Sequence, residues 1–127
     1  MQTYQNAINW FEIPANDIKR AKAFYETIFD MKLQELNIND DLKMALFPVE
    51  GDGTGGALVQ HQAFYHPSHQ GPLLYLNANP NLQAVLDRVP PNGGKVLIAK
   101  RQISPERGYM AVFEDSEGNR IALHSNG

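Results

Sequence analysis

Residues 109–121 have the sequence YMAVFEDSEGNRI, an apolar run that ends in a turn rich in Asp, Ser, Gly and Asn. Its first five residues repeat an earlier stretch, KMALF at 43–47, and both stretches precede an acidic, glycine-bearing turn and another apolar run. The later apolar runs also match, because a glycine and a histidine recur at the same spacing, at Gly55 and His61 and at Gly118 and His124. The sequence therefore predicts two copies of one module.

Each module is predicted to contain the element order βαβββ. In the first, apolar residues recur at helical spacing after Asp17, and Asn16 or Asp17 is expected to cap the helix. In the second, Asn79 precedes a proline that suits the first helical position, and Pro90-Pro91 ends the helix. The predicted strands are 7–14, 31–38, 42–48, 55–62, 72–76, 95–100, 109–114 and 119–125, and the predicted helices are 17–29 and 82–89.

The length of 127 residues, of which 43% are apolar, fits one compact domain. A module of about 60 residues buries little area alone, so the two copies are expected to share a core. We predict an α+β fold in which modules at about 1–62 and 71–127, joined by a linker at 63–70, form a curved mixed sheet around a cleft with the helices outside. That cleft is the expected place for a small-molecule site.

Composition excludes several classes of protein. The chain has 11 basic and 14 acidic residues, a net charge of −3, and no basic stretch, which argues against nucleic acid and membrane surfaces as partners. The opening residues lack the pattern of a secretory signal and no long apolar run follows, so the cytoplasm is the expected location. There is no cysteine, and any metal would need His, Asp or Glu ligands.

The ordered motifs resemble a known family over nearly the whole chain. They are WFEIP at 10–14, RAKAFY at 20–25, GGKV at 93–96 and the run at 109–121. Together they resemble the vicinal oxygen chelate (VOC) superfamily, which includes glyoxalase I, bleomycin resistance proteins and extradiol dioxygenases. The resemblance implies paired βαβββ modules, a homodimer, and a cleft that holds a divalent metal in the enzymes.

The resemblance also locates the positions at which metal-using members carry their ligands. The first-strand position is Trp10, and its counterpart in the second module is Pro72 or Leu74. The last-strand positions are Val59 and Ala122. None of these side chains can coordinate a metal, so no metal is expected at the usual positions. This argues against glyoxalase-like isomerisation and against ring-cleaving dioxygenation as those families perform them.

Three polar residues offer a displaced site. Glu12, His61 and His124 each lie two residues beyond one of these positions, and residues two apart share a face of a strand. Two histidines and a carboxylate match the ligand set of non-haem iron, so a divalent metal is one possible cofactor. Without metal, Glu12 could act as a base beside a neutral imidazole. The alternative is that all three are exposed residues near strand ends.

Trp10 could form a wall for a planar ligand, with Val59, Leu74 and Ala122 as further contacts, or it could simply belong to the core. Two functions therefore remain open. One is a small-molecule-binding protein resembling the antibiotic-sequestering members of the family. The other is a metal-dependent lyase, isomerase or dioxygenase that uses Glu12 and the two histidines.

Two further segments carry polar residues that are expected to be structural. The linker offers His66 and His69, but Pro67 argues against a helix that would bring them to a common face. Asp115 lies in a tight connection at 115–119, where Asp, Ser, Gly and Asn are typical turn residues. We expect no ligand site at either segment.

Overall fold

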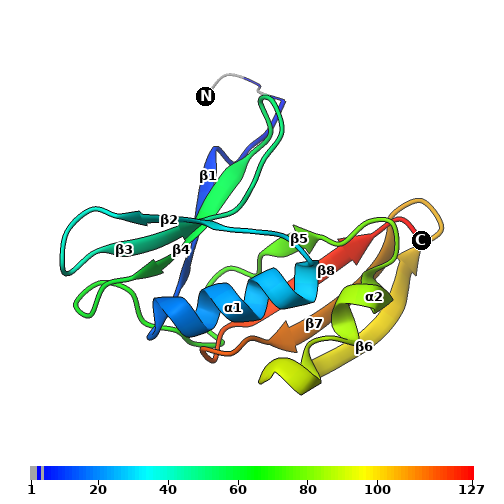
Figure 1. The fold of residues 1–127 in the computed structure, drawn as a ribbon. Helices are drawn as coiled ribbons and strands as arrows, with labels where there is room; N and C mark the ends of the chain where they lie inside the picture. The colour runs from blue at the N-terminus through cyan, green and yellow to red at the C-terminus, as the bar shows by residue number, and fades with distance from the viewer. Residues whose placement is uncertain (1–2, 4) are drawn as a thin grey trace.

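A computed structural model describes residue 3 and residues 5–127, so residues 1, 2 and 4 of the predicted first module lie outside the described residues. The element order is βαβββ twice, as Figure 1 shows. The bounds are β1 Trp10–Pro14, α1 Ile18–Phe29, β2 Gln34–Asn37, β3 Lys43–Leu46, β4 Gly55–Gln60, β5 Tyr75–Asn77, α2 Leu82–Leu86, the 3-10 helix η1 Pro90–Asn92, β6 Lys95–Ser104, β7 Gly108–Glu114 and β8 Arg120–Ser125. Within the described residues, neither α-helix is long and apolar enough to cross a membrane.

The strands form two four-stranded sheets, with the orders β1-β4-β3-β2 and β5-β8-β7-β6. Each sheet is mixed, because β1 pairs with β4 and β5 with β8 in parallel while the remaining pairs are antiparallel. The two sheets have equivalent strand orders, as expected for a duplicated module. The predicted α+β fold of two βαβββ modules is confirmed.

Both modules contribute to one apolar core. The rings of Phe24 and Tyr25 on α1 lie 6.1 and 6.5 Å, between centroids, from the ring of Phe113 on β7. The helix therefore packs against the second module as well as its own sheet. Its buried residues follow the predicted stripe and are Ile18, Ala21, Phe24, Tyr25 and Ile28. A shared core removes from water apolar area that a lone module would leave exposed.

Of the two predicted caps for α1, Asp17 is the one used. Its Oδ1 accepts hydrogen bonds from the backbone N–H groups of Lys19 at 3.1 Å and Arg20 at 3.2 Å. The backbone of Asp17 is extended, as is usual for a residue that precedes a helix. These bonds satisfy two of the N–H groups that the first turn leaves without helical partners.

Some boundaries differ from the prediction. Asn81, not Asn79, caps α2, because its side chain accepts from the backbone N–H of Gln83 at 3.0 Å. The side chain of Asn79 instead accepts from the backbone N–H of Asn126 at 2.7 Å. The second helix is also short, and a separate 3-10 turn precedes Gly93. Strand β6 is longer than predicted, because its polar second half continues pairing with β7 through register shifts.

The loop between β7 and β8 fixes the start of α1. Glu117 Oε1 accepts from the backbone N–H groups of Asn16 at 2.9 Å and Asp17 at 2.8 Å, and Arg20 Nε donates to Glu117 Oε2 at 2.7 Å. The Glu117 side chain is 1% exposed, whereas that of Arg20 is 54% exposed. Burial acts to raise the pKa of Glu117, but the hydrogen bonds from Arg20 and Asp17 outweigh it and lower that pKa.

Asp115 holds the same loop together, in agreement with its expected structural role. It is buried and accepts from the hydroxyl of Tyr25 at 2.7 Å and from the backbone N–H groups of Glu117 and Asn119, both at 2.9 Å. Burial raises the pKa of Asp115, although these hydrogen bonds oppose the rise. The bond to Tyr25 joins the loop of the second module to the helix of the first.

Candidate functional site: a groove beside the first strand

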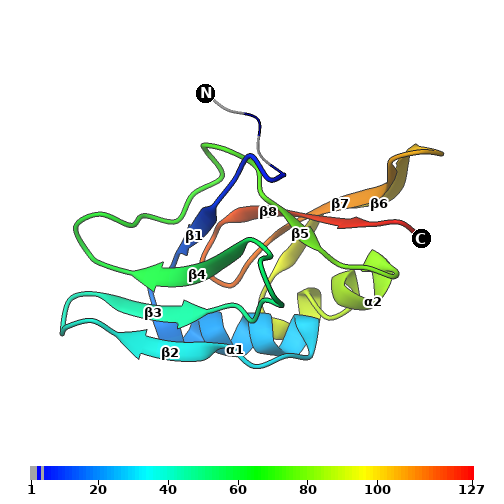
Figure 2. The same cartoon turned by 90° about the horizontal axis from the view of Figure 1, so that it is seen from above.

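A groove of about 400 Å³ lies between β1, the linker and the start of β8. The linker runs along the outer side of β1, as Figure 2 shows. Strand alternation places Phe11 and Ile13 toward the core, while Trp10, Glu12 and Pro14 lie on the other face. The groove is mainly apolar, and its lining includes Ile8, Trp10, Pro14, Pro72, Leu74 and Arg120.

Trp10 is not a core residue, because 46% of it is exposed. It lies in register with Gly55 on β4, and a Cβ atom at Gly55 would lie 3.2 Å from the indole ring. The absence of a side chain there leaves space for the ring against the sheet. The indole Nε1 donates to Glu12 Oε2 at 3.3 Å. An exposed aromatic face in a groove is suited to stacking on a planar ligand.

Both carboxylate oxygens of Glu12 already have partners. Oε2 accepts from Trp10, and Oε1 accepts from the hydroxyl of Tyr65 at 2.5 Å. This hydrogen bond, with some burial, raises the pKa of Tyr65. The sequence analysis missed Tyr65 because the contact joins a linker residue to a strand 53 residues away and carries no local signal. Trp10, Glu12 and Tyr65 together give the otherwise apolar groove one polar edge.

The structure does not bring Glu12, His61 and His124 together. His61 Nδ1 accepts from the backbone N–H of Ala63 at 3.2 Å. His124 lies in the second sheet, with Nε2 2.6 Å from the carbonyl oxygen of Arg107. Among the described residues, no group of three or more His, Asp or Glu side chains could hold a metal ion. The prediction assumed that the three side chains face one common cleft, whereas the two histidines contact separate turns.

The apolar residues predicted to contact a ligand lie in three settings. Val59 and Ala122 are both 0% exposed, so neither can touch a ligand in this conformation. Leu74 packs against the main core and also lines the groove. Tyr75 on β5 is in register with Ala122 on β8, whereas Leu74 precedes that strand. Of the predicted contacts, Trp10 and Leu74 share the groove.

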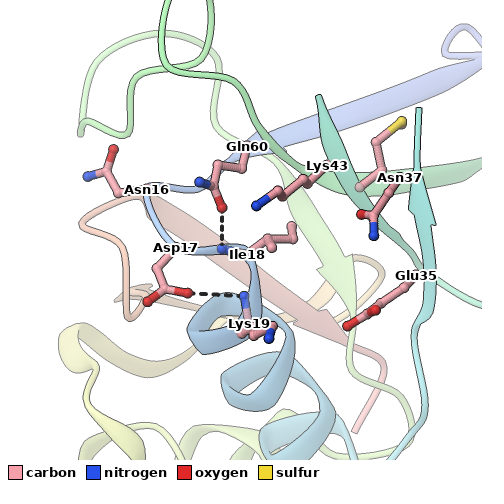
Figure 3. A pocket seen from close by; sticks show the side chains of 9 residues that line it. Asn16, Asp17, Ile18, Lys19, Glu35, Asn37, Lys43 and Gln60 are labelled. Atoms are coloured by element: carbon pink, nitrogen blue, oxygen red, sulfur yellow. Dashed lines mark hydrogen bonds between the residues drawn. The ribbon is translucent and has the colours of Figure 1, made fainter. Parts of the chain in front are cut away.

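A second, polar pocket of about 480 Å³ lies at the start of α1 (Figure 3). Side chains of Glu35 and Lys43 border it from β2 and β3. Gln60 Oε1 accepts from the backbone N–H of Ile18 at 2.8 Å, so the protein itself satisfies this helix N–H group. The pocket is larger than the groove, but it offers little apolar area. The groove is therefore the stronger candidate for a functional site.

Comparison with known proteins agrees with the fold. The model of the Glyoxalase/Bleomycin resistance protein/Dioxygenase superfamily matches residues 7–123. The chain belongs to this superfamily. A glyoxylase-like domain-containing protein from Didymella fabae is 33% identical over 119 residues, which cover 91% of each chain.

Solved structures show the same fold at low identity. A glyoxalase/bleomycin resistance protein from Albidiferax ferrireducens has a TM-score of 0.72 and 16% identity, covering 96% of this chain and 100% of that one. TnmS3, an antibiotic binding protein from a Streptomyces species, has a TM-score of 0.67 and 22% identity, covering 99% and 100%. A glyoxalase I mutant from Zea mays has a TM-score of 0.68 and 20% identity. The match covers 92% of this chain but only 45% of the maize chain.

Proposed function

We propose that this protein binds a small organic molecule with a planar, apolar part in the groove beside β1. The observation that carries the proposal is the 46% exposed Trp10, which forms a wall of that groove. A volume of about 400 Å³ lies within the range of small-molecule sites, and such sites combine apolar walls with a few polar groups. Pro72 and Leu74 supply apolar lining, while Glu12 and Arg120 supply the polar groups.

The superfamily supports this choice of function. TnmS3, whose fold this chain shares, is an antibiotic binding protein, so the fold is compatible with holding a small organic molecule. We carry over only the binding of a small organic molecule, because 22% identity does not specify which ligand is bound. The metal-dependent alternative at Glu12, His61 and His124 has no support from their positions within one chain.

We further propose that the protein is a cytoplasmic homodimer. Support for the dimer comes from apolar side chains that a lone chain leaves exposed on β6 of the second sheet, namely Val96, Leu97 and Ile98. Exposed apolar groups on an edge strand such as β6 favour association. Sedimentation at several concentrations tests this proposal, and a monomer at all of them would contradict it.

Binding can be tested with 2-naphthamide, a neutral aromatic probe. Trp10 is the only tryptophan, so its indole N–H gives one unambiguous NMR signal. We expect a saturable shift of this signal during titration. Calorimetry should show that Trp10→Ala weakens binding about tenfold, because the stacking surface is lost.

Tyr75→Ala is the matched control. Tyr75 is also an exposed aromatic residue, but it lies on β5 and does not line the groove. Its removal should leave the affinity for 2-naphthamide within about twofold, a difference of less than about 0.5 kcal/mol. An absent or non-saturable shift in the wild-type protein, or equal weakening by both substitutions, would refute the groove as the site.

A further inference from the structure

We infer that the groove selects ligands that carry a carboxylate, and that Arg120 is the residue that determines this specificity. The inference rests on the proposed binding function. The inference adds the chemical class of the ligand to that function. The ligand is a small aromatic or planar carboxylate, with its ring against Trp10 and its anionic group at the Arg120 end of the groove.

Arg120 has a buried donor that the protein does not use. The residue begins β8 and lines the groove. Its Nη2 donates to the carbonyl oxygen of Gly71 at 3.1 Å, which anchors the guanidinium. Its Nε atom is buried and has no hydrogen-bond partner among the described residues. The protein therefore leaves part of the donor capacity of this guanidinium unused, which is costly and rare for a buried group.

The acidic side chains near Arg120 already pair with other groups. Glu114 is its cross-strand partner, but Glu114 Oε1 lies 2.7 Å from His69 Nε2, and Oε2 lies 4.0 Å from Lys95 Nζ. Glu12 also lines the groove and accepts from Tyr65 and Trp10. No carboxylate among the described residues forms a salt bridge with Arg120. Its positive charge therefore remains available to a ligand.

The chemistry of guanidinium narrows the ligand class. It presents five N–H donors in a fixed planar arrangement that matches the two oxygens of a carboxylate, and such charge-assisted bonds are stronger than neutral ones. Apolar walls at Pro72 and Leu74 exclude a fully polar ion as the preferred ligand. Because Glu12 would repel an anion placed beside it, the carboxylate is expected next to Arg120 and the ring along Trp10.

The test compares 2-naphthoate with 2-naphthamide, which share a ring system and differ in charge. For the wild-type protein, calorimetry at low ionic strength should give at least about tenfold tighter binding of the carboxylate. Arg120→Gln should reduce this ratio of the two affinities to about one. Arg101→Gln removes an exposed arginine of β6 that does not line the groove, and it should keep the wild-type ratio.

Arg120→Lys covers the case in which Arg120→Gln does not fold. It keeps the charge but loses the planar fork, so it should bind 2-naphthoate more weakly than the wild type and still prefer it to the amide. Equal binding of both probes by the wild-type protein would overturn the inference and leave the proposed function standing. A preference that persists in Arg120→Gln, or that is lost equally in Arg101→Gln, would also overturn it. If neither probe binds, both proposals fail.

Discussion

Glu117 connects the two modules through a single carboxylate. It accepts from two backbone N–H groups and from Arg20 while its own side chain is 1% exposed. Glu117→Gln places an amide N–H₂ where donors already point, so we expect a loss of about 2–3 kcal/mol in the free energy of unfolding at neutral pH. Urea denaturation measures this loss.

The loss should depend on pH. Because the pKa of Glu117 is lower in the folded protein, its contribution is fully present above the unfolded value of about 4.3 and disappears as the pH falls through the folded value. The wild type and Glu117→Gln should therefore converge in stability once the pH falls below the lowered pKa that Glu117 has in the folded protein. Glu114→Gln, which removes a half-buried carboxylate paired with His69, should cost less than about 1 kcal/mol. A pH-independent difference for Glu117→Gln would contradict this account.

Tyr65 and Glu12 form a pair whose titration can be observed directly. Ionising the phenol breaks its hydrogen bond and places two negative charges together, so its pKa is raised in the folded protein. Glu12→Gln should lower the pKa of Tyr65 toward its usual value, as measured by NMR of the labelled ring carbon. Glu50→Gln, an exposed substitution elsewhere, should leave the titration unchanged. An unaltered pKa in Glu12→Gln would show that the contact is not formed in solution.

Single residues of the site were predictable only where local periodicity decides them. Strand alternation was enough to place Trp10 and Glu12 on one face away from the core. Tyr65 and Arg120 enter the site through contacts with distant parts of the chain, and no spacing rule encodes those contacts. Val59 lies on the same face of the sheet as Trp10 but is fully buried. Strand alternation predicts the face on which a side chain lies, and it does not predict whether other residues cover that side chain.

At the scale of elements, the start of α1 depends on Asp17. Its side chain accepts from two backbone N–H groups of the first turn, so Asp17→Ala should reduce stability by about 1 kcal/mol. Asn16→Ala is the control, because Asn16 contributes its backbone N–H to Glu117 and keeps it when the side chain is shortened. Thermal denaturation should separate the two variants. Equal loss in both would argue against capping by Asp17.

The pairing of β1 with β4 depends on the absence of a side chain at Gly56. A Cβ atom there would lie 2.3 Å from Cε1 of Phe11, which is partly buried and packs against the core. Gly56→Ala should therefore destabilise the fold by about 1–3 kcal/mol through overpacking. At Gly55 an added Cβ would meet the half-exposed ring of Trp10 at 3.2 Å and Val49 Cγ1 at 3.5 Å, so Gly55→Ala should cost clearly less. Equal unfolding midpoints in urea would contradict this difference.

Elements were predictable in kind and order, and less so at their ends. The apolar stripe of α1 repeats over three turns, which makes the period unambiguous. Strand β6 was underestimated because its second half, Lys100 to Ser104, is largely polar and exposed. Pairing with β7, rather than its own composition, keeps that half extended.

For the whole molecule, the shared core predicts one cooperative unfolding transition. Contacts from Phe24 and Tyr25 to Phe113, with the bond from Tyr25 to Asp115, join the modules. Fluorescence of Trp10 reports on the first module, and hydrogen exchange in β7 and β8 reports on the second. Both should give the same free energy of unfolding. Two separate transitions would show that the modules are independent.

The duplication made the overall architecture predictable, but not the site. Two similar modules imply two similar sheets, and both were found. How those sheets face each other depends on side-chain packing between them, which the repeat does not encode. This is why His124 contacts the turn before β7 instead of joining Glu12 and His61. The linker, which has no counterpart within the modules, supplies Tyr65 and one side of the groove.

The dependence of α1 on Glu117 also has a consequence for the order of folding during synthesis. A ribosome makes the first module before the loop at residues 115–119, because synthesis runs from the N-terminal side of the chain. Until that loop has been made, the backbone N–H groups of Asn16 and Asp17 lack their acceptor on Glu117. The native start of α1 therefore forms only once the second module is available to it.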